Sequence, residues 1–334
     1  MTSASDVIVI GAGWSGLSAA NSLARAGLSV QVIEKGRGPG GRSATRRQDG
    51  FQFDHGAQYF TARSAEFRTA LEAWRSAGLV AEWSPRIHVF GDKPAGGGRG
   101  SPSARWVGMP GMNGVLSHLA SELDCRFGER VHAIDFNGHW QVSLANGQSL
   151  SAHSLILTAP PAQAAALLGE AHPLTDELNN VPMKPTWAVM AGFDTSSGSS
   201  VDPGFDAAFD NEGPLSWLAL NRHKPGRTGG CAWTGHASVG WSQAHLERDA
   251  EWVAAELYAA LSNRLDVGDR QPDLLSTHRW RYAQCAATIN KGCLWHNNQR
   301  LAVAGDWCAG NRVEGAWTSG QRAAERVIES LQEK

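Results

Sequence analysis

The chain begins with a short apolar run that predicts a buried strand. Asp6 to Ile10 leads directly into a glycine-rich segment, residues 11–16, after which residues 17–26 show the apolar spacing of a helix. Gly27 supplies a left-handed stop for that helix. A second apolar run, from Ser29 to Ile33, predicts another strand. The pattern therefore indicates a strand, a glycine loop, a helix and a second strand in succession.

The middle of the chain mixes helical and strand-like patterns. The spacing of apolar positions predicts helices over Ser64–Gly78, from a turn at 109–113 to about Leu123, and over His245–Leu261. Strands are expected at Arg130–Phe136, Trp140–Leu144, Leu155–Thr158, Trp187–Phe193, Leu215–Leu220, Cys231–Ala237 and Leu274–Tyr282. Two turns are expected, a hairpin turn at Asn146-Gly147 and a glycine-rich turn between strands at Gly91–Ser103.

The C-terminal pattern returns to that of the first residues. Arg300–Ala304 predicts a strand, Trp307 to Asn311 a loop, and Val313 to about Leu331 a helix. A β-meander followed by such a return to a parallel sheet is typical of two-dinucleotide flavoproteins. We therefore predict an α/β fold in which a Rossmann-like dinucleotide-binding domain is interleaved with an antiparallel-sheet α+β substrate domain. The first comprises residues 1–80, 105–165 and 295–334, and the second comprises residues 81–104 and 166–294.

Composition permits this fold and narrows the possible partners. The 334 residues are 42% hydrophobic and 19% charged, enough for a large core. The net charge is −2 and no basic block is present, which argues against a nucleic-acid partner. No apolar run approaches the roughly 20 residues that span a bilayer, and residues 1–6 lack the features of a secretion signal. We therefore expect a cytoplasmic protein without membrane contact.

Two residue types have unusual counts. The five cysteines are scattered and lack metal-ligand spacing, so we expect reduced thiols and no metal; they are Cys125, Cys231, Cys285, Cys293 and Cys308. Tryptophan occurs 14 times and tyrosine only 3 times. Most indoles will be core or domain-interface residues, but such an excess also suits a protein that must sandwich a flat ring.

The glycine loop and the acid after the second strand predict a dinucleotide site. Gly11 permits a tight turn, Gly13 lets the backbone approach a pyrophosphate, and Gly16 allows helix and strand to pack closely. The N-terminus of the helix offers free N–H groups to the phosphates. Glu34 follows Gly16 by eighteen residues, where its carboxylate can bind both hydroxyls of a ribose.

The segment after Glu34 indicates which dinucleotide is bound. Residues 35–42, KGRGPGGR, form a glycine-rich turn whose last residue, Arg42, can place a guanidinium on the pyrophosphate. A basic surface loop is the plainer alternative. The run resembles the GGR signature of the flavin amine oxidase superfamily, and this resemblance implies FAD. It also implies further cofactor contacts, from Ala12, Lys35, Gln58 and Val131.

The loop after the last strand supplies two more candidate cofactor residues. Asp306 stands at the strand end, where it can accept hydrogen bonds from a ribityl chain or hold a phosphate through water. The N–H groups near Val313 and Glu314 would face the flavin N1/O2 edge, where negative charge grows on reduction. An ordinary strand, loop and helix is the alternative for this segment read alone.

Longer matches narrow the resemblance. The segments GAQYFTAR (56–63), RWVG (105–108), GDWC (305–308) and RVEGAW (312–317) look like the bacterial renalase-like flavoproteins. The likeness covers essentially the whole chain, including KPTWA (184–188) and HRW (278–280). It implies a p-hydroxybenzoate hydroxylase-like fold with non-covalent FAD. It also implies oxidation of abnormal dihydronicotinamide isomers, chiefly 2-dihydro-NAD(P) and also 6-dihydro-NAD(P), to NAD(P)+, with the electrons passed to O2 as H2O2.

Hydride transfer to a flavin requires stacking and positioning, and neither a nucleophile nor a metal. Candidate walls for a flat nicotinamide are Tyr59, Phe60, Trp187 and Trp280, for each of which a plain core position is the alternative. We assign no residue as a general acid or base, because a hydride donor needs no proton removed first.

Polar candidates for the substrate flank these aromatics. Arg63 and Arg312 could hold a carboxamide, ribose or phosphate, or could instead pair with an acid such as Glu66 or Glu314. Thr61 and Ala62 complete the first of these segments as candidate substrate-binding residues. His236 ends a predicted strand, where the family has a pocket histidine, and a satisfied core histidine is the alternative reading.

Two rival functions use the same signals. A true amine oxidase or a desaturase would share the scaffold, but amine oxidases commonly carry a lysine that reaches the flavin through water, and some attach FAD to cysteine. The neighbourhood of Cys308 does not match that attachment motif. Apart from the C-terminal Lys334, Lys291 is the only lysine in the last 110 residues, and it stands in an expected loop. The second rival is a non-enzymatic FAD-binding module.

Overall fold

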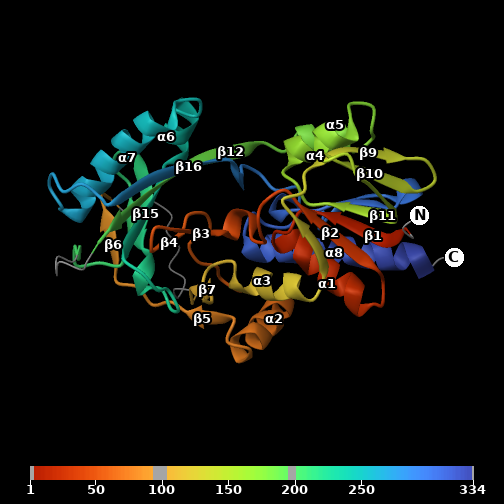
Figure 1. The fold of residues 1–334 in the computed structure, drawn as a ribbon, viewed down its shortest axis with the longest axis horizontal. Helices are drawn as coiled ribbons and strands as arrows, with labels where there is room; N and C mark the ends of the chain where they lie inside the picture. Colours follow the sequence, from red (N-terminus) through yellow and green to blue (C-terminus); the bar gives the residue numbers. More distant parts are fainter. Residues whose placement is uncertain (1–3, 93–103, 195–200, 333–334) are drawn as a thin grey trace.

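The computed structural model describes residues 4–92, 104–194 and 201–332, so most of the turn predicted at Gly91–Ser103 lies outside the described residues. Figure 1 shows two lobes, with both chain termini on one of them. Two long strands, β12 (Met183–Phe193) and β16 (Leu274–Cys285), run from one lobe towards the other. Among the described residues, no helix is long and apolar enough to cross a membrane.

The first lobe is built on an eight-stranded sheet whose centre is parallel. Its order is β17 (Leu294–His296), β18 (Leu301–Val303), β11 (Ser149–Leu157), β1 (Ser5–Ile10), β2 (Val30–Glu34) and β8 (Asp124–Phe127). An antiparallel meander of β9 (Val131–Phe136) and β10 (Trp140–Leu144) extends from β11. The strand β1 pairs in parallel with both β2 and β11, and β11 pairs in parallel with β18. The predicted Rossmann-like α/β fold is confirmed.

The two ends of the chain meet in this lobe. The helices α1 (Trp14–Arg25) and α8 (Val313–Gln332) pack side by side, and Ser15 Oγ donates a hydrogen bond to the Ala316 carbonyl at 2.7 Å. Gly320 makes this approach possible, because a Cβ there would overlap the Ser15 carbonyl. The C-terminal helix therefore completes the nucleotide-binding lobe that the N-terminal residues begin.

The two faces of this sheet have separate cores. Val7 and Val9 point into a cluster with α1, α8, α2 (Ala65–Ser76) and α3 (Gly114–Ser121). Ile8 and Ile10 point into the opposite cluster, under the meander, α4 (Pro161–Leu168) and α5 (Thr175–Asn179). Ala164, Leu178 and Val181 belong to that cluster, so residues 166–182, which we predicted to begin the substrate domain, pack on the first sheet.

The second lobe is a six-stranded, mainly antiparallel sheet. Its order is β16, β12, β15 (Cys231–Ala237), β14 (Leu215–Leu220), β13 (Ala207–Asp210) and β6 (Ile87–Phe90). The helices α6 (Val239–Ala244) and α7 (Ala250–Leu265) cover one face (Figure 1). The opposite face meets the hairpin of β3 (Thr45–Gln48) and β4 (Phe51–Asp54), where Met190 packs on Phe51 and Phe53.

Strand alternation decides which residues of β12 face the helices. Trp187, Val189 and Phe193 point into the helix-covered core, whereas Met190 points to the hairpin. One predicted boundary on this face is wrong. The helix that we expected over His245–Leu261 begins at Ala250, because the Asp249 side chain caps it by accepting a hydrogen bond from Trp252 N at 2.7 Å.

The remaining elements connect the lobes. A short pair of strands, β5 (Val80–Glu82) and β7 (Trp106–Gly108), follows α2. The 3-10 turns are η1 (Gly41–Ser43), η2 (Asn221–His223), η3 (Asn297–Gln299) and η4 (Asp306–Cys308). The helix expected from the turn at 109–113 to about Leu123 is shorter, since α3 covers only Gly114–Ser121.

Candidate functional site

The glycine loop between β1 and α1 has the geometry of a dinucleotide cradle. Gly11 has a φ of +110°, and a Cβ on Gly16 would overlap the Gly11 carbonyl, so helix and strand can approach only because that side chain is missing. Around Gly13, in contrast, no atom lies within 4 Å of where a Cβ would be. The space beside Gly13 is open, as the approach of a pyrophosphate to the backbone requires.

Glu34 lies at the end of β2 beside this loop. Its Oε2 accepts a hydrogen bond from Ala12 N at 2.9 Å, and its Oε1 accepts one from Gly36 N at 2.6 Å. A carboxylate has about four acceptor positions, so it can still accept two ribose hydroxyls. Glu129 N donates to the Glu34 carbonyl at 3.0 Å, which brings the start of β9 and its first residue, Val131, to this end of the cradle.

One basic candidate, Arg42, lies elsewhere than we predicted. The Arg42 guanidinium does not extend over the glycine loop: it forms a two-pronged ion pair with Asp306 and donates at 3.0 Å to the Ala283 carbonyl. The reason is that β16 brings Ala283 beside η1, so the two groups fix the guanidinium at the junction of the lobes. Lys35 is exposed, and its Nζ donates to Gln163 Oε1 at 2.9 Å.

The cradle fits FAD. The turn that ends in Arg42 lies against the glycine loop, since Gly40 N donates to the Ala12 carbonyl at 3.0 Å. Asp306 in η4 precedes Val313, the first residue of α8, so the predicted ribityl and flavin contacts occur in one loop. A dinucleotide held by Glu34 and Gly13 at one end would extend towards Asp306 at the other.

The segment after β4 joins this cradle to the second sheet. Ala57 N donates to the Arg42 carbonyl at 2.8 Å, and a Cβ on Gly56 would overlap that carbonyl and also press on the Trp280 indole. From β16, Trp280 Nε1 donates to the His55 carbonyl at 2.8 Å. The residues predicted to hold the flavin and the predicted stacking residue Trp280 therefore meet at Gly56.

Three histidines surround this junction. His236 and His278 lie opposite Ala188 on either side of β12, so they share the face that meets the first lobe. The His55 ring lies 5.0 Å from the Trp280 ring and 4.9 Å from the His278 ring. His236 Nε2 lies 3.1 Å from the His55 carbonyl. His55 and His278 were not candidates from the sequence, where nothing distinguishes them from surface histidines.

All three histidines are neutral at physiological pH. Burial lowers the pKa of His55 to about 3, with His278 and Arg46 acting in the same direction. Burial likewise lowers the pKa of His236 to about 4, with a contribution from Lys224, and the pKa of His278 to about 4, with a contribution from Arg46. The charged groups that act on this cluster are thus cations.

Two cations supply this positive field. Arg46 donates to Ser276 Oγ at 2.9 Å and lies 3.4 Å from His278 Nδ1, and it forms no ion pair with an acid in the described part of the chain. Lys224 belongs to a buried cluster with Asp54 and Arg227, in which Asp54 Oδ2 lies 3.2 Å from Lys224 Nζ and 2.7 Å from Arg227 Nη2. These residues were missed because N-R-H-K-P-G-R (221–227) has the composition of an exposed basic turn.

The aromatic candidates separate into two groups. Tyr59 is half-buried, and its ring contacts Trp83 and Trp217, with the Arg105 guanidinium 5.3 Å from its centroid. Tyr59 and Trp280 both remain candidate walls. Tyr59 lies one residue from Gln58 in the segment that joins the lobes.

Two of the predicted walls are wrong. Phe60 packs in the core of the first lobe, 5.8 Å from the Trp14 ring and 6.0 Å from the Phe67 ring. Trp187 is 3% exposed, lies on the helix-covered face of the second sheet, and donates to the His245 carbonyl at 3.1 Å. Strand alternation places it on the side opposite to Trp280.

The segment of Thr61, Ala62 and Arg63 is fixed to the start of α8. Glu314 Oε2 accepts a hydrogen bond from Arg63 N at 2.9 Å, and Glu314 Oε1 accepts one from Ser64 N at 2.7 Å. Glu314 therefore binds the backbone at the start of α2, where the helix dipole favours a carboxylate. The Arg63 and Arg312 side chains are exposed, which leaves them available to a substrate.

The thiols are unsuited to catalysis. Burial raises the pKa of all five thiols. For Cys125 and Cys293 the pKa rises to about 11. All five are unpaired. A protonated, buried thiol is a poor nucleophile, and Cys308 has no exposed surface.

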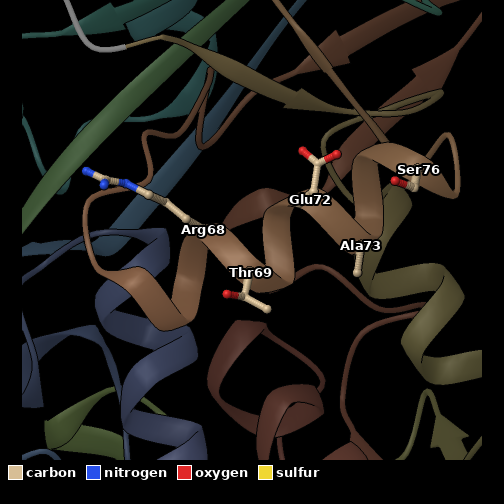
Figure 2. Close-up of a pocket in the computed structure, with 5 residues that line it drawn as sticks. All are labelled: Arg68, Thr69, Glu72, Ala73 and Ser76. Atoms are coloured by element: carbon tan, nitrogen blue, oxygen red, sulfur yellow. The ribbon is translucent and has the colours of Figure 1, made fainter.

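One surface hollow lies away from this junction. Figure 2 shows it on the exposed side of α2, lined by Arg68, Thr69, Glu72, Ala73 and Ser76. Its residues come from one helix and bring together no group from the glycine loop or the second sheet. We therefore place the functional site at the junction of the lobes.

The fold and the site together define a flavoprotein oxidoreductase. Residues 9–75 match the NAD(P)-binding Rossmann-like domain, and residues 95–328 match the family described as flavin containing amine oxidoreductase. The second match covers more than half of the chain, so the chain belongs to the flavin-containing amine oxidoreductase family. Its cofactor is FAD.

Individual relatives resemble the chain in two different ways. It is 58% identical over 55 residues to 4,4'-diapolycopene oxygenase of Methylomonas sp, which is 16% of this chain and 11% of that protein. It is 52% identical over 50 residues to zeta-carotene-forming phytoene desaturase of Myxococcus xanthus, which is 15% of this chain and 10% of that protein. The chain thus spans about a tenth of the length of these curated relatives.

Solved structures match over the whole chain. A putative protoporphyrinogen oxidase from Exiguobacterium sp. 255-15 has a TM-score of 0.76 at 15% identity, covering 99% of this chain and 100% of that one. Putrescine oxidase bound to putrescine has a TM-score of 0.72 at 15% identity, covering 98% and 99%. At this identity the likeness shows the fold alone.

Proposed function

We propose that the protein is an FAD-dependent oxidase that takes a hydride from abnormal dihydronicotinamide isomers. The substrates would be 2-dihydro-NAD(P) and also 6-dihydro-NAD(P). The chemistry supplied by bound FAD is acceptance of the hydride and delivery of two electrons, with a proton from solvent, to O2, so that the products are NAD(P)+ and H2O2. The partners in this proposal are a small dinucleotide and O2, in the cytoplasm.

The positive field at the junction of the lobes carries this proposal. Burial lowers the pKa values of His55, His236 and His278 to about 3 to 4, and the cations Arg46 and Lys224 act in the same direction. A cationic amine would be repelled by these groups, whereas a dinucleotide brings two phosphates and a neutral dihydronicotinamide ring. The exposed guanidinium groups of Arg63 and Arg312 are candidate partners for the phosphates.

Positioning is the task left to the protein. Trp280 is fixed by its hydrogen bond to the His55 carbonyl, so its indole can serve as a rigid wall for a stacked ring. The neutral His236 offers a polar contact without a charge. No described residue has to remove a proton before the hydride leaves.

A second candidate is oxidation of an amine or desaturation of a small molecule. The family, the putrescine oxidase fold neighbour and the desaturase relatives favour this kind of reaction. The desaturase match extends over only 50 residues, however, a length that suits the dinucleotide-binding segment. In this candidate Lys291 is not the flavin-side lysine, because it is exposed and paired with Glu177 Oε1 at 2.6 Å.

Anaerobic reduction of the bound FAD separates the two candidates. Isomerised NADH and NADPH, containing the 2- and 6-dihydro forms, are mixed with the protein, and a panel of amines including putrescine is mixed in parallel. Our proposal expects loss of the flavin absorbance with the dihydronicotinamides and formation of one H2O2 per NAD(P)+ when O2 is admitted. Bleaching by amines alone would support the second candidate, and bleaching by neither panel would argue for a binding module.

A further inference from the structure

A buried ion cluster with an unequal number of charges lies beside the candidate site. The side chains of Asp54, Lys224 and Arg227 have no exposed surface. Asp54 Oδ2 accepts from Lys224 Nζ at 3.2 Å and from Arg227 Nη2 at 2.7 Å. Two cations and one carboxylate leave one positive charge uncompensated. Such a charge is costly to bury, so its retention points to a role that an apolar core would not supply.

The two cations of this cluster have different surroundings. Arg227 donates twice to Asp54 and also to the carbonyls of Gly108 and Pro225, so its hydrogen bonds remain inside the cluster and its own loop. Lys224 makes one contact with Asp54 and donates at 2.9 Å to Gln58 Oε1. The ion pair that Lys224 forms is thus the looser one, and its charge extends towards Gln58.

Gln58 connects Lys224 with the candidate site. Because its Oε1 faces Lys224, its amino group points the other way, towards the Asp54 and Gly56 carbonyls and to within 3.5 Å of His236 Nε2. Gly56 lies against the carbonyl of Arg42, the last residue of the glycine-rich turn in the FAD cradle. A single side chain therefore separates the buried ammonium from the junction of the lobes.

We propose that Lys224 is a positioning residue that, through Gln58, brings the excess positive charge of this cluster to bear on the FAD site and so stabilises the negative charge that reduction places on the flavin. A fixed charge in a site that excludes water acts more strongly than in solvent and needs no reorganisation. An amide polarised by a cation at its oxygen is also a stronger donor at its nitrogen. The proposal rests on the FAD site and not on the identity of the hydride donor.

Lys224 is also the group of this cluster that titrates near neutral pH. Burial lowers its pKa to about 8, with Asp54 opposing and Arg227 adding to this shift. Of the titratable groups that face it, Asp54 has a pKa of about 2 and His236 has one of about 4. A loss of the stabilising charge is therefore expected at about pH 8.

The experiment measures the flavin directly and needs no substrate. The FAD-loaded wild type and Lys224→Met variant are titrated with sodium sulfite, which adds to the flavin and leaves negative charge on it, and their two-electron potentials are determined against a reference dye at pH 7. We expect sulfite to bind at least tenfold more weakly to the variant. The potential should fall by the equivalent of a tenfold change in the reduction equilibrium, about 30 mV.

Matched variants separate charge from structure. Lys224→Arg keeps the charge and should remain within twofold of wild type for sulfite. Gln58→Leu keeps the buried lysine but removes the amide that lies between Lys224 and the FAD site. Like Lys224→Met, it should weaken sulfite binding. Lys291→Met removes an exposed lysine that is paired with Glu177 and should change neither value.

Lys224→Gln also removes the charge but retains a hydrogen-bond donor for Asp54. It is measured as a second neutral variant, so that the test does not depend on the folding of Lys224→Met. If either neutral variant loses thermal stability but keeps the reduction potential and the sulfite affinity of the wild type, the proposal is overturned. Lys224 would then have a structural role only. A Lys224→Arg variant that behaves like Lys224→Met would overturn the proposal as well.

Discussion

In the first lobe, the groups at the ribose and pyrophosphate end of the cradle follow one another closely along the chain, whereas the groups at the substrate end come from distant strands. Gly11, Gly13, Gly16 and Glu34 lie within one strand–helix–strand unit. Around Trp280, in contrast, His55, which follows β4, meets residues of β15 and β16 through tertiary contacts.

The difference lies in what specifies each region. The cradle depends on local backbone geometry, which glycines impose wherever they occur. The substrate end depends on strand register and on buried charge. A change in the second lobe should therefore affect stability or flavin chemistry according to the sheet face it occupies, and a change in the cradle should affect FAD retention.

The largest effect is expected from Asp54→Ala. The substitution leaves Lys224 and Arg227 buried without their carboxylate, which should lower the free energy of unfolding by about 3–5 kcal/mol. Denaturant unfolding of the FAD-free protein measures this. Asp202→Ala, at an exposed ion pair with Arg86, is the control and should change little. A loss for Asp54→Ala no larger than that of the control would show that the buried cluster is not a unit.

The ionisation of the same carboxylate predicts that the free energy of unfolding falls at low pH. Its neighbouring cations hold the pKa of Asp54 at about 2, below its ordinary value of 3.8. The carboxylate is therefore protonated more readily in the unfolded chain, and its contribution is complete above about pH 4 and is lost as the pH falls towards 2. The difference in stability between wild type and Asp54→Ala should shrink over that interval.

The two faces of the second sheet give the next largest contrast. Trp187→Ala opens a cavity under α7 and should cost about 3–5 kcal/mol, while the folded variant keeps its rate of flavin reduction. Trp280→Ala should instead slow anaerobic flavin reduction by up to about 100-fold through lost positioning, with FAD still bound. Stopped-flow reduction and unfolding curves for both variants test this, and the reverse pattern would contradict our assignment of the faces.

Within the cradle, Gly16 and Gly13 should respond differently to the same methyl group. Gly16→Ala forces a Cβ onto the Gly11 carbonyl and should destabilise the protein by about 1–3 kcal/mol. Gly13→Ala meets no protein atom and should leave the FAD-free protein as stable as wild type while weakening FAD binding. Equal losses of stability would mean that the space beside Gly13 is not reserved for a ligand.

Glu34→Ala is expected to act mainly on FAD binding, although it also removes the acceptor of the Ala12 and Gly36 N–H groups. Removing charge-assisted hydrogen bonds to a ribose should weaken FAD binding by about 1.5–3 kcal/mol. Fluorescence of FAD released on dilution measures this, and Glu34→Gln should lose less because it retains an acceptor. An unchanged dissociation constant would place the ribose elsewhere.

Arg312→Ala should have the smallest effect. An exposed guanidinium that holds a phosphate contributes equally to ground and transition states, so the half-saturating substrate concentration should rise roughly three- to fivefold at a constant maximal rate. Rapid-mixing reduction at several substrate concentrations separates the two constants. A change in the maximal rate alone would give Arg312 a different role.

Much of the cradle could be predicted from the sequence, because each glycine of the loop has a local steric reason for its position. The face occupied by Trp187 could not, since a run of apolar residues on a strand buried on both sides does not show which side meets the ligand. Arg42 was predicted near the phosphates, but β16 approaches from more than two hundred residues away and fixes it on Asp306 and Ala283.

The buried charges, and His55 and His278 of the histidine cluster, were not indicated by any local pattern in the sequence. Lys224 and Arg227 occur in a polar, proline-containing turn that is typical of a surface, and only the pairing of β14 and β15 carries them beneath Gln58. Burial keeps His55 and His278 neutral, and that burial is a property of the assembled lobes.

The central claim is that this site takes a hydride from a neutral ring in a positive field, and anaerobic flavin reduction between pH 6 and pH 9 tests it most directly. With isomerised NADH, the rate constant should be level up to about pH 8 and fall above it as Lys224 loses its proton. The Lys224→Arg variant should remain level throughout. An amine oxidase requires the neutral amine, so reduction by amines with a steep rise in rate over the same interval, and none by dihydronicotinamides, would contradict the account.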